Sequence, residues 1–225
     1  MESIIKAKDV IRNADAVLIG ASNGLSISEG YNIFADNEMF RKQFGDFRHK
    51  YRLRNVLDGL LSQNMTPEDR QTFLDRLVEL WTDKYEVTQV MKNLRSLIGD
   101  KPYFILTTNG DQHLEAVGFA AERIWEIEGT FQLARDGKHP INRQENLNRF
   151  LQEYGDKRLV VLELGIGSIN RIIKLPLMRL VHQLPDATYI TLNLPHEIYV
   201  PQEIEAKSIP LQGDILMTLD KLVRP

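Results

Sequence analysis

The sequence predicts an α/β fold, a Rossmann-like parallel sheet with helices on both faces and an inserted all-helical small domain. Six short apolar runs are typical of buried strands, at residues 15–19, 102–108, 123–129, 158–164, 187–193 and 207–211. Helical patterns lie between several of them, as in a sheet whose parallel strands alternate with helices. From residue 31 to residue 99 no convincing strand occurs. We therefore expect a main domain of residues 1–30 and 100–225 and a helical small domain of residues 31–99.

The first elements can be read in order from the apolar pattern. Residues 2–13 place their isoleucines and Val10 roughly on one helical face, and the run at 15–19 follows as a buried strand. This strand leads into GASNGLSISEG at 20–30, whose small residues are too flexible for the interior of an element. The stretch at 20–30 is therefore the first candidate for a functional loop.

The clearest helical segments of the small domain are residues 47–63 and 67–87. The second has a well-marked start, because Thr66 is a good N-cap and Pro67 suits the first helical position. Glu68 and Asp69 then lie near the positive end of the helix dipole. The chain of 225 residues is long enough for a helical insertion of this size.

Composition excludes several classes of function. The 28 basic and 31 acidic residues leave a formal charge of −3, which does not suit a nucleic-acid partner. The absence of cysteine excludes disulfides, cysteine catalysis and thiolate zinc sites, and the five histidines are too scattered to suggest a metal. The charged N-terminal segment resembles neither a secretory signal nor a membrane span. We expect a cytoplasmic protein with no membrane partner.

Ligands of a doubly wound sheet bind at the carboxyl ends of its strands, and the loops there are unusual in this chain. They are GASNGLSISEG at 20–30, NGDQH at 109–113 and GIGS at 165–168, with Asn193 after the next strand. Each has a simpler structural explanation: glycine turns, an Asx turn with Asp111 as N-cap of a helix at 112–122, and a solvated Glu128. Taken together, the loops suggest a nucleotide site.

In their order, these loops resemble those of the sirtuin family of NAD-consuming enzymes. Residues 24–30 (GLSISEG) match the sirtuin pattern G-x-S-x-S-x-G, and Phe34 lies where the family has an aromatic residue in a mobile cofactor loop. Thr107, Asn109 and Asp111 match the family's T-x-N-x-D. The resemblance spans nearly the whole chain.

Within the family, the chain is most similar to the macrodomain-linked class M sirtuins. Residues 20–26 (GASNGLS) resemble the G-A-G-A-G-L-S loop of that branch, and residues 172–176 resemble its I-I-K-x-P segment. The lack of cysteine also separates the chain from sirtuins whose small domain binds zinc. The resemblance implies a protein ADP-ribosyltransferase with NAD as substrate and no metal. A lipoyl-carrier protein is the acceptor in that branch, and a macrodomain hydrolase acts in the same pathway.

The resemblance also implies the site residues. Asn109, Asp111 and Glu128 take the catalytic positions, although Glu128 stands where ordinary sirtuins have histidine and class M enzymes have glutamine. Ser22 and Asn23 replace a glycine and an alanine of the class M loop. The implied nucleotide-binding residues are Gly20, Ala21, Ser22, Gly24, Ser26, Tyr31, Phe34, Thr108, Gly165, Gly167, Ser168, Asn193 and Asp214.

Three functions follow from these matches and departures. ADP-ribosyl transfer to a protein is the expected one, because a carboxylate at position 128 can still accept a proton from an incoming acceptor. A degenerate module that binds NAD or ADP-ribose without turnover is the alternative from a different class. Hydrolysis of NAD, or weak deacylation, is the third.

Overall fold

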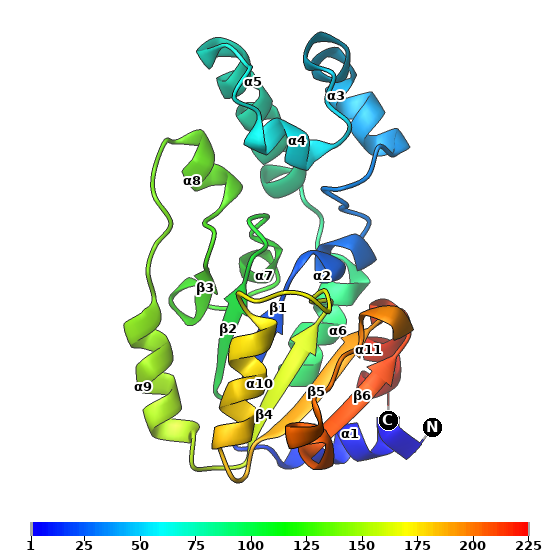
Figure 1. Cartoon of the computed structure of the whole chain (residues 1–225), viewed down its shortest axis with the longest axis vertical. Coiled ribbons are helices and arrows are strands. Elements are labelled where there is room, and N and C mark those ends of the chain that lie inside the picture. Colours follow the sequence, from blue (N-terminus) through cyan, green and yellow to red (C-terminus); the bar gives the residue numbers. More distant parts are fainter. Residues whose placement is uncertain (1, 225) are drawn as a thin grey trace.

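A computed structural model describes residues 2–224 of the chain (Figure 1). Six parallel strands form a single sheet in the order β3-β2-β1-β4-β5-β6, which is the order of a Rossmann fold. The sequence prediction of a Rossmann-like parallel sheet is confirmed. The strands are β1 (Ala16–Ala21), β2 (Tyr103–Thr107), β3 (Ile124–Glu126), β4 (Leu159–Leu164), β5 (Thr188–Asn193) and β6 (Ser208–Gln212). All six predicted strands are present, but β3 ends three residues earlier than expected. Glu128 and Gly129 therefore lie beyond the strand, in a turn closed by the Gly129 amide on the Glu126 carbonyl (2.9 Å).

The strand order reverses at the centre of the sheet. β1 pairs with both β2 and β4, so that Leu18 lies between Phe104 and Val161. Every residue of β1 and β4 is buried, which explains their mainly apolar character, with Glu163 of β4 as the exception. The loops that follow β1 and β4 consequently lie next to each other at the carboxyl edge, where α/β sheets bind their ligands.

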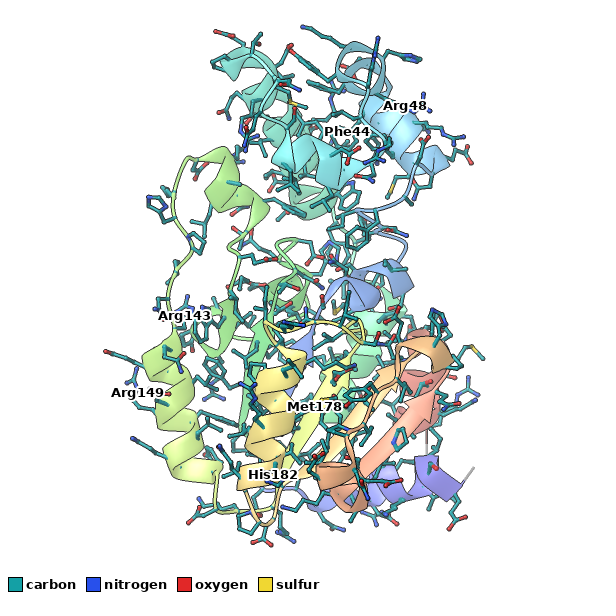
Figure 2. All side chains as sticks on the ribbon, viewed as in Figure 1. Phe44, Arg48, Arg143, Arg149, Met178 and His182 are labelled. Carbon is teal, nitrogen blue, oxygen red and sulfur yellow. The ribbon has the colours of Figure 1, made fainter. Side chains whose placement is uncertain are left out.

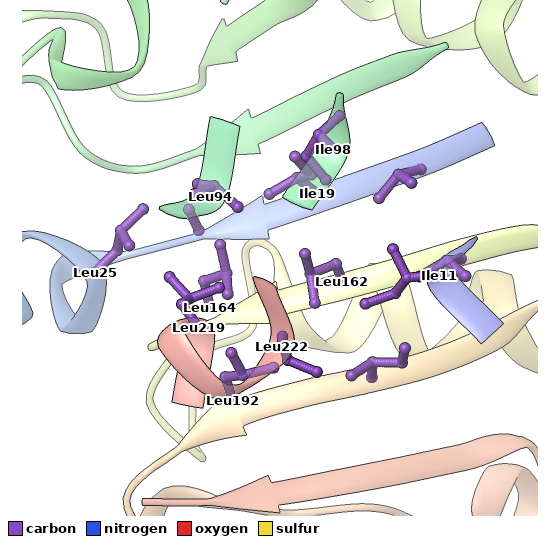
Figure 3. Packing of buried hydrophobic residues seen from close by; sticks show 14 of the residues in the cluster. Ile11, Ile19, Leu25, Leu94, Ile98, Leu162, Leu164, Leu192, Leu219 and Leu222 are labelled. Atoms are coloured by element: carbon purple, nitrogen blue, oxygen red, sulfur yellow. The ribbon is translucent and has the colours of Figure 1, made fainter. Parts of the chain in front are cut away.

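Helices cover both faces of the sheet, as predicted. On one face lie α1 (Glu2–Asn13), α6 (Gln89–Ile98) and α11 (Ile215–Val223), which pack on Val17 and Ile19 of β1 (Figure 3). On the other face lie α9 (Gln144–Tyr154) and α10 (Lys174–Gln183), which pack on the alternate residues Ala16 and Leu18. This alternation divides the hydrophobic core into two layers.

Several short elements connect the strands. They are α2 (Asn23–Ser28), α7 (His113–Ala116), α8 (Phe131–Arg135) and three 3₁₀ turns, η2 (Ala121–Arg123), η3 (Pro195–Glu197) and η4 (Gln202–Lys207). The helix predicted at 112–122 is thus reduced to the single turn α7. No helix within residues 2–224 is long and apolar enough to cross a membrane.

A helical lobe stands above the sheet, built from α3 (Glu38–Tyr51), α4 (Val56–Leu61), α5 (Pro67–Val78) and the π-helical turn η1 (Glu79–Asp83) (Figure 1). Its core is rich in aromatic side chains, among them the fully buried Phe44, Phe73 and Trp81. Figure 2 shows Phe44 and Arg48 on neighbouring turns of α3, where Arg48 pairs with Asp36. Packing of these aromatic side chains against one another stabilises the lobe.

The lobe differs from the sequence prediction in three ways. The predicted helix at 47–63 is wrong, because Arg52 adopts a left-handed conformation (φ 55°) and the Asn55 side chain caps the new helix α4. The helix predicted at 67–87 ends early, because α5 ends at Val78 and the π-helical turn η1 ends at Asp83. Its predicted start at Thr66 is confirmed, since the Thr66 side chain accepts a hydrogen bond from the Asp69 amide (3.2 Å). Phe131 of α8 also packs in the core of the lobe, although it lies 50 residues beyond Trp81.

Residues 89–98, predicted to belong to the small domain, form α6 and pack in the core of the sheet. Leu94 and Ile98 join the same cluster as Ile19 and Leu219 (Figure 3). By packing, the core of the lobe therefore spans Phe40 to Trp81 and Phe131. The pattern of apolar and polar residues shows which side of a helix is buried, but it does not show which other helix or sheet covers that side.

Candidate active site

Two cavities open at the carboxyl edge of the sheet. The first, here called the sheet-edge cavity, has a volume of about 550 Å³ and lies over the ends of β1, β4 and β5. The second, here called the lobe cavity, has a volume of about 420 Å³ and lies between the sheet and the helical lobe. Asn23 lines both of them. Both volumes fall in the range of small-molecule sites, and the shared residue Asn23 of α2 places the two cavities next to each other.

Predicted residues divide between the two cavities. Those that line the sheet-edge cavity are Ser22, Gly24, Phe34, Gly165, Gly167, Asn193 and Asp214. Those that line the lobe cavity are Ser26, Thr108, Asn109, Asp111 and Glu128. The fold thus brings together twelve of the sixteen predicted positions at this edge, although they come from six separate segments of the chain.

The other four predicted residues lie outside both linings. Gly20 and Ala21 belong to β1 itself, and a Cβ at Gly20 would lie 2.3 Å from Leu177 of α10, so Gly20 allows helix and sheet to pack. Tyr31 packs edge-on against the rings of Trp81 and His113. Ser168 donates its amide to the Glu197 carboxylate (2.7 Å).

The loops after β1 and β4 meet at Gly24 and Gly165. The Gly24 amide donates to the Gly165 carbonyl (3.0 Å), and the Ser22 amide donates to the Leu164 carbonyl (3.3 Å). The Leu25 amide donates to the Ser22 carbonyl (2.8 Å). Three amides of the loop predicted to cradle a phosphate therefore already have partners within the fold, and ligand contacts fall to the remaining groups of the lining.

A buried ion pair supports the loop after β4. Lys174 and Glu163 are fully buried, with Nζ and Oε1 2.8 Å apart, and Lys174 also donates to the Ile166 carbonyl (3.0 Å). The Asn193 side chain donates to the same carbonyl (2.9 Å). Burial raises the pKa of Glu163, while the positive charge of Lys174 and hydrogen bonds oppose that rise. The sequence pattern around Ile172–Pro176 contained Lys174 but gave no sign of this supporting role.

Asn109 is held in one orientation by two hydrogen bonds. Its Nδ2 donates to the Ser22 carbonyl (3.2 Å) and to Ser26 Oγ (2.9 Å). Because a carbonyl only accepts, the amide nitrogen must face Ser22 and the oxygen must face the other way. Asn109 Oδ1 is buried and has no hydrogen-bond partner within residues 2–224. An unpartnered buried acceptor costs about 1–3 kcal/mol, which a ligand donor can recover.

Asp111 is fixed by the same network. Ser26 Oγ donates to Asp111 Oδ2 (2.5 Å), and the His113 amide donates to Oδ1 (3.2 Å). The second bond forms the Asx turn that the sequence suggested, with Gln112 rather than Asp111 at the N-cap position of α7. Asp111 thus has both a structural bond and a place in the lining of the lobe cavity.

Glu128 is exposed and lies in the lining of the lobe cavity together with Asn109 and Asp111. Its turn is joined to the loop after β2, because the Phe131 amide donates to the Gly110 carbonyl (2.8 Å). A carboxylate at the mouth of the cavity can take up a proton from a nucleophile that enters there.

The rest of the lobe cavity is mainly apolar. Its walls include Ile33, Leu57, Leu60, Leu61, Trp81, Phe131 and Ala134, with Arg70 as the basic member. An apolar wall beside two carboxylates and an amide suits a site from which water is excluded during reaction. Within the described residues, 2–224, no group of acidic or histidine side chains has the arrangement of a metal site.

Sequence reasoning missed two groups beside the site. Glu197 lines the sheet-edge cavity, and its hydrogen bond from the Ser168 amide lowers the pKa of its carboxyl group. Glu29 and His113 form a buried pair behind the lobe cavity, with Oε2 and Nδ1 2.9 Å apart. Both members of that pair stood in the motifs already singled out, GLSISEG and NGDQH, but only folding reveals that they touch.

The chain is similar in sequence to a protein of known name. No protein-family model matches the chain. A protein ADP-ribosyltransferase of Staphylococcus aureus is 24% identical in an alignment that covers 100% of this chain and 89% of that protein. The chain is therefore similar over its whole length to a protein of that name.

Solved structures show the same fold. A complex of a Sir2 homologue with NAD superposes with a TM-score of 0.64 and 13% identity, covering 98% of this chain and 92% of that one. A complex of a Sir2 homologue variant with ADP-ribose gives a TM-score of 0.61 and 13% identity, covering 97% and 94%. Taken with the sheet order, these similarities show that the chain has the fold of the Sir2 structures.

Proposed function

We propose that this chain is a sirtuin-like, NAD-consuming enzyme that transfers ADP-ribose to a protein acceptor. The observation that carries the proposal is the unpartnered, buried Asn109 Oδ1 in a cavity that also holds Asp111 and Glu128. Further support comes from the full-length similarity to a protein ADP-ribosyltransferase and from the fold shared with Sir2 complexes of NAD and ADP-ribose.

The two cavities fit the two halves of NAD. The sheet-edge cavity, with its glycine turns and Asn193, suits the adenosine half, and the lobe cavity suits the nicotinamide half. NAD supplies a ribose whose bond to nicotinamide can break through a state that resembles an oxocarbenium ion. Residues lining both cavities must therefore hold the dinucleotide across α2.

Each candidate catalytic residue has a separate task in this proposal. Asp111 binds the carboxamide of nicotinamide, and Asn109 Oδ1 accepts a hydrogen bond from the ribose side and keeps water out. Glu128 takes the proton of the incoming acceptor, for which its exposed position at the cavity is suitable. The hydroxyl groups of Thr108 and Ser22 share a hydrogen bond (2.9 Å), which holds the loops after β1 and β2 together.

The finer identity of the enzyme belongs to the same proposal. The loop at 20–26 and the absence of zinc-binding cysteines favour the class M branch. In that case the acceptor is a lipoyl-carrier protein, and a macrodomain hydrolase removes the modification. We keep the cytoplasm as the expected place of action, and we expect no metal to take part.

The test is to incubate the pure protein with NAD and a lipoyl-carrier protein, and to measure released nicotinamide and the mass of the carrier. The proposal expects both nicotinamide and a carrier heavier by one ADP-ribose. Asn109→Ala and Glu128→Ala should each lose at least tenfold in nicotinamide release. Glu145→Gln, an exposed substitution on α9, is the matched control and should retain the activity.

Other outcomes identify the alternative functions. Calorimetric binding of NAD without nicotinamide release or adduct indicates the binding module, which the unusual Glu128 favours. Nicotinamide and free ADP-ribose without an adduct indicate NAD hydrolysis. Full turnover by both site variants contradicts the assignment of Asn109 and Glu128.

A further inference from the structure

His113 is a completely buried histidine between the sheet and the helical lobe. Its two ring nitrogens both face acceptors: Nδ1 lies 2.9 Å from Glu29 Oε2, and Nε2 lies 2.8 Å from the Trp81 carbonyl. A neutral imidazole has one N–H and can satisfy only one of them. Only the doubly protonated imidazolium donates to both, so the surroundings of His113 select its charged form.

The groups around the ring agree with that charge. The ionisable side chains that face it are Glu29 after α2, Asp111 before α7, Tyr85 after η1 and Tyr31 after α2. Tyr85 stacks on the imidazole with ring centroids 3.6 Å apart, and cations bind favourably to the faces of aromatic rings. Burial opposes the charge, but the hydrogen bond that the ring donates to Glu29 and the charge of Asp111 outweigh it and raise the pKa of His113.

Glu29 is a suitable partner for a permanent cation. Its side chain is fully buried and accepts hydrogen bonds from Tyr85 and Thr88 (2.5 Å each) in addition to the contact with His113. Three partners hold the carboxylate in a single position. The pair therefore resembles a fixed buried ion pair. Removal of one partner of such a pair strongly destabilises the folded protein.

His113 is linked directly to the lobe cavity through Asp111. The His113 amide donates to Asp111 Oδ1 (3.2 Å), and the ring Nδ1 lies 3.8 Å from Oδ2. On the other side, the ring nitrogen Nε2 reaches the lobe at Trp81, and Thr82 Oγ1 donates to the Asp111 carbonyl (3.1 Å). The orientation of Asp111 and the seating of the helical lobe thus depend on the same ring.

We propose that His113, as an imidazolium paired with Glu29, is a positioning residue that keeps Asp111 aimed into the lobe cavity. This inference rests on the proposed function, in which Asp111 binds the nicotinamide carboxamide. His113 itself touches no substrate, because it is completely buried behind the cavity lining.

The proposal has a definite pH dependence. The active form is the protonated one, so NAD cleavage is retained below the pKa of His113 and is lost as the pH rises through it. Glu29→Gln keeps the size of the side chain and an oxygen that can accept the hydrogen bond from the Tyr85 hydroxyl. It removes the negative charge next to the ring. Loss of an opposite charge at this distance changes a pKa by roughly 1–3 units. The basic limb of the pH profile should therefore move to lower pH by at least one unit.

The experiment combines kinetics with NMR. Nicotinamide release is measured from about pH 6 to pH 10 for the wild type and for Glu29→Gln, and proton–nitrogen spectra report the charge of the His113 ring. The expected result is two protonated ring nitrogens near pH 7.5 in the wild type, loss of one of these protons at a lower pH in Glu29→Gln than in the wild type, and the shifted basic limb. His182→Gln, which removes an exposed histidine of α10, is the control and should leave the pH profile unchanged.

Failure of this inference can be distinguished from failure of the proposed function. A neutral His113 in the wild type near pH 7.5, or a folded Glu29→Gln with an unshifted profile, overturns it. If the wild type cleaves no NAD, the proposed function fails, and the NMR spectra with calorimetric titration of NAD at two pH values still decide the role of His113. If Glu29→Gln does not fold, the wild-type spectrum and its pH titration decide it alone.

Discussion

Gly24 and Gly165 touch backbone to backbone where β1 and β4 end. Besides the hydrogen bond between them, a Cβ at Gly24 would lie 2.5 Å from the Gly165 Cα, and a Cβ at Gly165 would lie 2.5 Å from the Gly24 Cα. Gly165 also has a φ of +60°, a conformation that costs other residues roughly 1–2 kcal/mol. The two loops can therefore approach each other only because both positions lack a side chain.

We expect Gly24→Ala and Gly165→Ala each to lower the free energy of unfolding by about 2–4 kcal/mol, because the new methyl group meets backbone that cannot rotate away. The affinity for NAD should also fall in both variants, since both residues line the sheet-edge cavity. Urea unfolding and calorimetry measure the two effects. Gly45→Ala is the control, because a Cβ there meets nothing within 4 Å. Wild-type stability in either site variant contradicts the prediction.

Much of the fold could be predicted because parallel sheets leave a strong signal. Strands such as β1 and β4 are buried on both faces and appear as apolar runs, which in β4 only Glu163 interrupts. The loops of the site could be located for the same reason, because a strand that ends in small or polar residues marks the carboxyl edge of the sheet. Asn109 and Asp111 were found by this route.

What could not be predicted depends on contacts between distant residues. The break between α3 and α4 depends on the Asn55 cap, and α6 packs on the sheet because α11, near the end of the chain, packs beside it. The pairing of Glu29 with His113 joins residues 84 positions apart. Local patterns carry no information on such pairs.

The buried Lys174 should be a strong determinant of stability. Lys174→Met leaves Glu163 as a buried carboxylate without a positive partner and removes a donor from the Ile166 carbonyl. We expect a loss of about 3–5 kcal/mol in the free energy of unfolding. The double variant Glu163→Gln with Lys174→Met should be more stable than Lys174→Met alone, because the amide needs no counter-charge. Arg54→Met, at an exposed ion pair, is the control and should lose less than about 1 kcal/mol.

The loss in Lys174→Met should depend on pH in a defined direction. Burial raises the pKa of Glu163 from its ordinary value of 4.5, and removal of the cation allows it to rise further. Between the unfolded and the folded pKa, the folded state holds a proton that the unfolded state releases, so stability falls as the pH rises. Urea unfolding at about pH 5 and pH 8 should show the larger deficit at pH 8, and an equal deficit at both contradicts the ionised state of Glu163.

Glu197 should favour NAD over NADP. Its carboxylate lies in the lining of the sheet-edge cavity, and the Ser168 amide lowers the pKa of the group, mainly by hydrogen bonding to the charged form. An acidic side chain beside an adenosine ribose accepts hydrogen bonds from its hydroxyl groups and repels a 2′-phosphate. In the proposed function that ribose lies next to Gly165, Gly167 and Asn193, which line the same cavity.

We expect Glu197→Gln to prefer NAD over NADP less strongly than the wild type does. The measure is the ratio of the dissociation constants of NADP and NAD, obtained by calorimetry. The carboxylate side chain is 36% exposed, so water screens its charge, and we expect a change of no more than about tenfold. Glu203→Gln, an exposed substitution on η4, should leave the ratio unchanged. An unchanged ratio in Glu197→Gln with normal NAD affinity places the ribose elsewhere, because a carboxylate beside the 2′ position must discriminate between a hydroxyl group and a phosphate.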